Sequence, residues 1–132
     1  VFGEELMIDN VERALEAACQ QTEAIVKEYT GAPIFMESNA KGAHEWMIEF
    51  SNEPNDFEVF KKSFDDELKK LNSDYEAKRY NNMTLREPVI HQARPHLFFE
   101  WMSSRGKLGG QNKVPRLSNE REYIEPLLQL NK

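Results

Sequence analysis

The sequence predicts an α+β fold: a small, mostly antiparallel sheet of three to four strands, packed with four to five helices in a two-layer or three-layer sandwich. Apolar residues recur every three or four positions in several stretches, as on amphipathic helices. Within residues 44–50, Trp46, Ile48 and Phe50 instead alternate with Glu45 and Glu49, as in a strand. The length of 132 residues, with 39% apolar and 30% charged residues, suits one globular domain.

The first helix is expected over residues 9–29, with Asp9 as its cap and Gly31 and Pro33 as its stop. A second helix is expected over residues 56–71, and residues 72–79 continue it or form a separate short helix. Five apolar side chains step along the second helix by three or four positions: Phe57, Phe60, Phe64, Leu68 and Leu71.

Strands are expected over residues 34–36, 44–50 and 88–93. In the second of these, Glu45 and Glu49 alternate with Trp46, Ile48 and Phe50, as on a strand with one buried face. A short helix is expected over residues 95–102. The last helix is expected over residues 119–130, where the proline at 126 kinks or breaks it.

Charge is distributed unevenly along the chain. Residues 105–118 hold four cations and no acid, which leaves 13 cations against 23 acids in the remainder. An acidic body argues against broad binding of nucleic acid or anionic membranes. A cationic, glycine-rich segment on that body points either to a small local anion or to a solvated loop paired with nearby acids.

Several other classes of site find no support in the sequence. No apolar run is long enough to span a membrane, so no membrane contact is expected. Cys19 is the single cysteine, which excludes an intrachain disulfide. His44, His91 and His96 share no ligand-like spacing, so no metal site is expected. Because the chain begins at Val1, we expect it to be part of a longer protein.

Residues 105–117 carry the residue types most suited to chemistry. Gly109 and Gly110 permit close approach of the backbone to a ligand, and Gln111 offers a polar donor. Lys113 is a flexible point charge for phosphate or carboxylate, while Arg116 suits bidentate contact with oxyanions or pairing with a carboxylate of the body. The stretch does not fit the P-loop pattern, and a glycine-rich loop with a lysine is a weak signal by itself.

Two sequences carry a family resemblance: GKLGGQNKVPRLSN at residues 106–119 and LNSDYEAKR at residues 71–79. Together they resemble the C-terminal region of the auxin-responsive Gretchen Hagen 3 family, whose members are acyl acid–amido synthetases of the adenylate-forming group. The front half fits mainly by the order of its elements. Within the upstream motif, Tyr75 is expected to pack, and Glu76 and Arg79 to form a surface pair.

The resemblance implies that residues 1–132 form the small C-terminal lid of a two-domain enzyme whose large N-terminal adenylation domain is its partner. A cytoplasmic location is expected from the use of ATP and the lack of targeting signals in the sequence. It implies that ATP and Mg²⁺ convert a small carboxylic acid to an acyl-adenylate, which an amino acid then attacks. Lys113 is the implied catalytic residue, and the isolated domain is expected to be inactive. The implied nucleotide-binding residues are Gly109, Gly110, Gln111 and Arg116.

Two alternatives stay open beside this interpretation. The lid of an acyl-CoA ligase, which makes a thioester instead of an amide, would have the same sequence character. A non-enzymatic α+β regulatory or binding module would share the architecture, because such folds host many functions. An RNA-binding sheet, however, should show an aromatic motif and a basic face, and neither is visible in the sequence.

Overall fold

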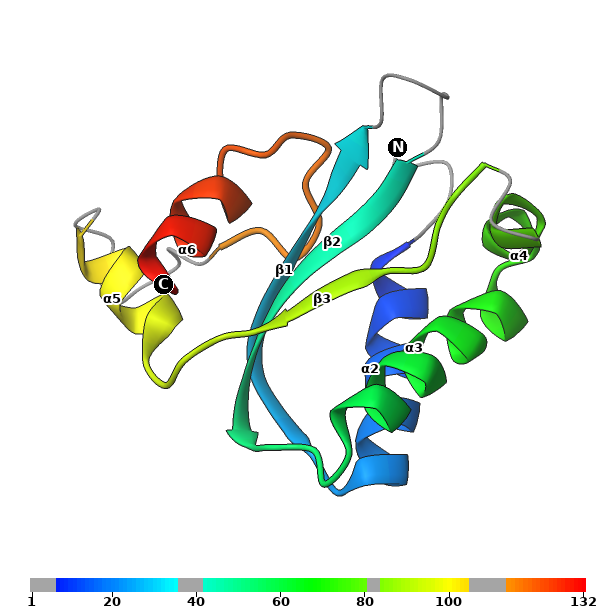
Figure 1. Ribbon diagram of the computed structural model, residues 1–132, viewed down its shortest axis with the longest axis horizontal. Helices are drawn as coiled ribbons and strands as arrows, with labels where there is room; N and C mark the ends of the chain where they lie inside the picture. The colour runs from blue at the N-terminus through cyan, green and yellow to red at the C-terminus, as the bar shows by residue number, and fades with distance from the viewer. Residues whose placement is uncertain (1–6, 36–41, 81–83, 105–113) are drawn as a thin grey trace.

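The computed structural model describes residues 7–35, 42–80, 84–104 and 114–132 (Figure 1). Strand β1 pairs antiparallel with β2, and β2 pairs parallel with β3, in the order β1-β2-β3. The predicted α+β class is confirmed, with three strands and five helices among the described residues. The strands are β1 (Ile25–Phe35), β2 (Gly42–Asn52) and β3 (Val89–Gln92). The helices are α2 (Ile8–Thr22), α3 (Phe57–Leu71), α4 (Ser73–Arg79), α5 (Leu97–Ser104) and α6 (Ile124–Leu130).

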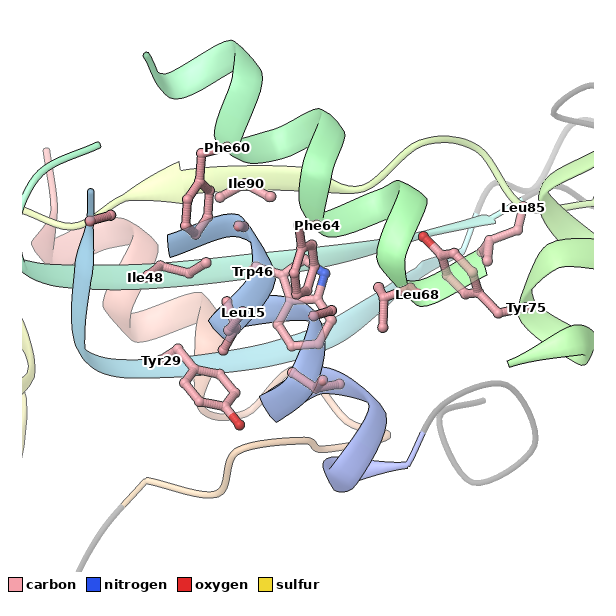
Figure 2. Packing of buried hydrophobic residues seen from close by; sticks show 14 residues of the cluster. Leu15, Tyr29, Trp46, Ile48, Phe60, Phe64, Leu68, Tyr75, Leu85 and Ile90 are labelled. Atoms are coloured by element: carbon pink, nitrogen blue, oxygen red, sulfur yellow. The ribbon is translucent and has the colours of Figure 1, made fainter. Parts of the chain in front are cut away.

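Helices cover both faces of the sheet, so the molecule is a three-layer sandwich (Figure 1). On one face, α2 and α3 pack on an apolar cluster that contains Trp46, Phe60 and Phe64 (Figure 2). On the other face, α5 and α6 cover a second cluster that includes Met47 and Leu127. Burial of these two clusters is the main stabilising contribution to the fold.

The first helix is shorter than predicted. Helix α2 ends at Thr22, and Glu23 follows it in the left-handed conformation with φ of 59°. The prediction of helix up to residue 29, with a stop at Gly31, is wrong because β1 already begins at Ile25. The β-branched side chains of Ile25 and Val26 favour the strand at this point.

Side-chain caps define where α3 and α4 begin. The Asp56 carboxylate accepts a hydrogen bond from the Val59 amide at 3.2 Å, and the Asn72 side chain accepts one from Tyr75 at 2.9 Å. Since Asn72 starts a new helix, residues 73–79 form a separate element rather than a continuation of α3. The N-cap of α2 is Met7, so the prediction of Asp9 as its cap is wrong.

Strand β2 is buried on both faces, which contradicts the prediction of one buried face. The exposed fractions of Glu45 and Glu49 are only 7% and 3%. The reason is that α5 and α6 cover the face on which these carboxylates lie, together with Met47.

The last helix begins at Ile124 rather than at residue 119. Pro126 therefore lies in its first turn, where the missing N–H costs no helical hydrogen bond. The predicted kink at this proline is wrong for that reason.

Candidate functional site

The segment Val114–Ser118, which we call the anchored segment, runs along the free edge of β1 (Figure 1). The Gly31 amide donates a hydrogen bond to the carbonyl of Arg116 at 2.9 Å, and the Ser118 amide donates to the carbonyl of Gly31 at 3.1 Å. Leu117 thereby forms a parallel bridge with Gly31. The anchored segment thus acts as a short additional pairing partner of the sheet.

Two further contacts fix the start of the anchored segment. The Thr30 hydroxyl donates a hydrogen bond to the Pro115 carbonyl at 2.6 Å. Val114 is buried in the apolar cluster beneath α5 and α6. The first described residue after position 113 is therefore held by packing, and the next by a hydrogen bond to β1.

Gly31 is required here because of the aromatic side chain opposite it. A Cβ atom at this position would lie 2.5 Å from two ring carbons of Trp46, its cross-strand neighbour. Carbon atoms pack favourably only at about 3.5–4.0 Å. Glycine at 31 therefore allows β1 to lie close against the buried indole while its backbone pairs with the anchored segment.

Arg116 is held in place by two residues of β1. Its Nη1 lies 2.6 Å from Oε1 of Glu28, and its guanidinium lies 4.7 Å from the ring centroid of Tyr29. The Tyr29 hydroxyl in turn donates a hydrogen bond to Glu12 on α2. Burial, and then the hydrogen bond to Glu12, raise the pKa of the Tyr29 phenol above its ordinary range, so the phenol stays protonated.

Of the residues that the resemblance implicates, only Arg116 is described. It pairs with a carboxylate of the body, and 36% of its side chain is exposed. Lys113, Gly109, Gly110 and Gln111 lie outside the described residues. Within the described ranges, no group of three or more histidine, cysteine or acidic side chains is placed to hold a metal ion.

The upstream motif at residues 71–79 forms a buried polar network. The Tyr75 hydroxyl donates to Oδ1 of Asp65 at 2.6 Å, and Nε of Arg79 donates to the same oxygen at 2.9 Å. The predicted packing of Tyr75 is confirmed, because it is fully buried. The predicted surface position of Arg79 is wrong, since only 7% of it is exposed.

Protonation equilibria reflect the same network. Burial alone would raise the pKa of Asp65, but hydrogen bonds from Arg79 and Tyr75 outweigh it and lower the pKa of this carboxyl. Burial, with the nearby Asp65 charge, raises the pKa of the Tyr75 phenol well above its ordinary range. Asp65 was missed by sequence reasoning, although its place beside Phe64 on the apolar stripe of α3 was a signal.

A surface groove of about 430 Å³ adjoins this network at α3. Its charged lining balances four cations against four acids, and the cations form ion pairs with acids of the same groove. The cations are Lys61, Lys62, Lys69 and Arg79, and the acids are Glu58, Asp65, Asp66 and Glu87. Because its charges balance, the groove is a weak candidate for anion binding.

Residues 9–122 match the family model described as the GH3 family C-terminal domain. The chain belongs to the GH3 family. This confirms the resemblance carried by residues 71–79 and 106–119. A search of curated proteins found no match.

The GH3 fold is also found among solved structures. A structure titled "AtGH3.15 acyl acid amido synthetase in complex with 2,4-DB" matches with a TM-score of 0.69 and 19% identity over 93% of this chain. Another, titled "GH3.15 acyl acid amido synthetase", matches with a TM-score of 0.70 and 19% identity over 96% of this chain. The GH3 domain described here spans only 23% and 24% of those two chains.

No described helix of this domain is long and apolar enough to cross a membrane.

Proposed function

We propose that this GH3 domain is the lid of an ATP-dependent acid–amino acid ligase, and that it helps a larger N-terminal adenylation domain to form an acyl-adenylate. Membership of the GH3 family supports the ligase class. The observation that carries the site is the anchored segment, which β1 holds directly after Lys113. A lysine that stabilises a reacting phosphate must be held in a defined position, and a fixed backbone directly after it favours this.

The proposed role of Lys113 follows from the charges of the reaction. Attack of a carboxylate oxygen on the α-phosphorus of ATP forms the acyl-adenylate and breaks the bond from that phosphorus to the α–β bridging oxygen, so pyrophosphate leaves. The attack brings two anions together, and negative charge gathers on the transferring oxygens. An ammonium group placed there stabilises that charge in the transition state. Mg²⁺ would enter with ATP and share this task when bound.

Arg116 is proposed to assist from the same segment. Glu28 and the ring of Tyr29 orient its guanidinium, which has five N–H donors, so part of the fork remains available to phosphate oxygens. Gly109, Gly110 and Gln111 are proposed to bring backbone and amide donors to the nucleotide. The acid and the amino acid would bind mainly in the N-terminal domain.

This division of labour predicts that residues 1–132 alone are inactive. One wall of a cleft cannot enclose a nucleotide in the way that a pocket does. A cytoplasmic location is proposed because the reaction consumes ATP.

The test uses the full-length protein and measures acid-dependent exchange of pyrophosphate into ATP. We expect Lys113→Ala to lower the exchange rate about 10²–10³-fold, the usual effect of removing one stabilising contact to a transition state. Lys70→Ala is the matched control, because the Lys70 side chain is 76% exposed on α3. Exchange by Lys113→Ala at the rate of the control would refute the proposed role.

Product analysis separates the two ligase classes. The full-length protein is supplied with ATP, a carboxylic acid and either a mixture of amino acids or coenzyme A. Amide formation without thioester supports the proposal, whereas thioester formation alone would place the domain in an acyl-CoA ligase.

A further inference from the structure

The sheet of this domain has two outer strands, β1 and β3, and the fold closes the free edge of β1. Gly31 bonds to the anchored segment through both its amide and its carbonyl. The Tyr29 amide donates to the Glu28 carboxylate at 3.1 Å, and the Pro33 carbonyl accepts a hydrogen bond from Arg121 at 2.9 Å. Because proline has no N–H, this edge has few groups left to bind another strand.

Strand β3 has an open edge. It pairs with β2 on one side, and Figure 1 shows no described strand on its other side. Just after β3, the Ala93 amide donates to the carbonyl of Ile48 on β2 at 2.8 Å. Because backbone groups alternate in direction along a strand, those of His91 also face β2, whereas those of Ile90 and Gln92 face outward.

Most of the outward-facing groups of β3 are unpaired. The Asn131 side chain donates to the Gln92 carbonyl at 3.3 Å. Within the part of the chain that the structure describes, the amides of Ile90 and Gln92 and the carbonyl of Ile90 make no hydrogen bond. Edge strands are commonly protected by charged side chains, but β3 contains no lysine, arginine or acid. Two amides and one carbonyl are therefore available to another strand.

A groove of about 390 Å³ lies beside the same edge. It is lined by residues 86–90, by the ends of β1 and β2 that lie next to them, and by Lys61 of α3. A strand that pairs with an edge directs alternate side chains into pockets beside it, which gives such pairing its specificity. Here the pocket suits an apolar side chain, because most of its lining is apolar: Ile34, Ala43, Pro88, Val89 and Ile90.

We propose that an extended segment from the N-terminal part of the full-length protein pairs with the free edge of β3 and places an apolar side chain in this groove. Most sheets have about four to six strands, whereas three are described here. The domain spans only 23% and 24% of the two GH3 structures that it matches, so a full-length protein of similar size has ample chain to supply the segment. The inference rests on the proposed function, in which the N-terminal adenylation domain is the partner of this domain.

Two other states of this edge compete with the proposal. The edge could remain in contact with solvent, or it could pair with β3 of a second copy of the protein. These states differ in the hydrogen exchange of the Ile90 and Gln92 amides, since an amide exchanges slowly when it is held in a stable hydrogen bond.

The experiment measures hydrogen exchange at single amides in residues 1–132 and in the full-length protein. The full-length protein is measured with and without ATP and a carboxylic acid, because a lid takes up more than one position. In at least one of these conditions, we expect the Ile90 and Gln92 amides to exchange at least about tenfold more slowly than in residues 1–132. The amides of His91 and Ala93, which face β2, serve as internal references.

Gln92→Pro tests whether strand pairing causes this protection. Proline removes one outward-facing amide and obstructs an approaching strand, while the bonds from β3 to β2 remain. Gln92→Ala is the matched control, because it removes the exposed side chain and keeps the amide. In the full-length protein, Gln92→Pro should return the Ile90 amide to its exchange rate in residues 1–132, and Gln92→Ala should match the parent. The comparison with residues 1–132 needs no variant, so it stands even if Gln92→Pro does not fold.

Four results would overturn the proposal. The first is fast exchange of Ile90 and Gln92 in the full-length protein under both conditions. The second is equal protection in residues 1–132, and the third is protection that persists in Gln92→Pro. The fourth is protection that appears only in a dimer detected by sedimentation, because a second copy would then cover the edge. None of these measurements depends on activity, whereas a parental rate of pyrophosphate exchange for Lys113→Ala refutes the proposed function.

Discussion

Gly31→Ala tests the packing that supports the anchored segment. The added methyl carbon would lie 2.5 Å from Cε3 and Cζ3 of Trp46, about 1 Å inside a favourable contact. The indole is fully buried, and the ring of Phe64 packs edge-on against it with centroids 5.3 Å apart. The ring therefore has little room to move, and overpacking of this kind costs about 1–3 kcal/mol.

The assay is urea and thermal unfolding of residues 1–132, followed by far-ultraviolet circular dichroism. The expected loss corresponds to a fall in Tm of about 4 °C per kcal/mol for a domain of this size. The control is the same substitution in a Trp46→Leu background, where the methyl group meets no ring. There, Gly31→Ala should be neutral or stabilising by up to about 1 kcal/mol, because alanine restricts the unfolded chain. An equal cost in both backgrounds would refute the proposed clash.

Two further predictions concern pH. Asp65→Asn should lower the free energy of unfolding at neutral pH by about 3–5 kcal/mol, since it leaves Arg79 buried without its charged partner. Folding lowers the pKa of Asp65, so the contribution of its carboxylate to the free energy of unfolding is present above about pH 4 and lost as pH falls further. A difference in the free energy of unfolding between variant and parent that stays constant in acid would contradict this. Folding raises the pKa of Tyr29 and Tyr75, so the contribution of these two phenols to the free energy of unfolding is complete below about pH 10 and lost above it. Ultraviolet difference absorbance should therefore show that these two phenols ionise only as the domain unfolds. Ionisation of all four tyrosines in the folded domain would disprove that assignment.

The sequence predicts elements that carry their own start and stop signals. The phenylalanine stripe of α3 and the short helix after it were located almost to the residue. The prediction of helix over residues 23–29 is wrong because Ile25, Val26 and Tyr29 extend the helical pattern. No glycine or proline separates the helix from the strand at this point. Over seven residues, periods of 2.0 and 3.6 are poorly resolved, and tertiary pairing with β2 decides the outcome.

The same error hid part of the candidate site. Glu28 was assigned to a helix, so its pairing with Arg116, 88 positions away, had no basis in the predicted elements. Local patterns report which residues share a face, but they do not report which distant segment packs on that face. The edge of β1 is a candidate site because the anchored segment pairs with it, and this pairing joins residues far apart in the sequence.

Glu45 and Glu49 show that a local signal for burial was present but ambiguous. Alternation alone placed them on a solvent face, as in most half-buried strands. Met47 lies between them on that same face, and a large apolar side chain there is better explained by a covered surface. A covered face turns two ordinary surface glutamates into buried charges, which must find donors. The donors that they find are the N-terminus of α5 and Arg121, so the burial of β2 on both faces is also what ties α5 and Arg121 to the sheet.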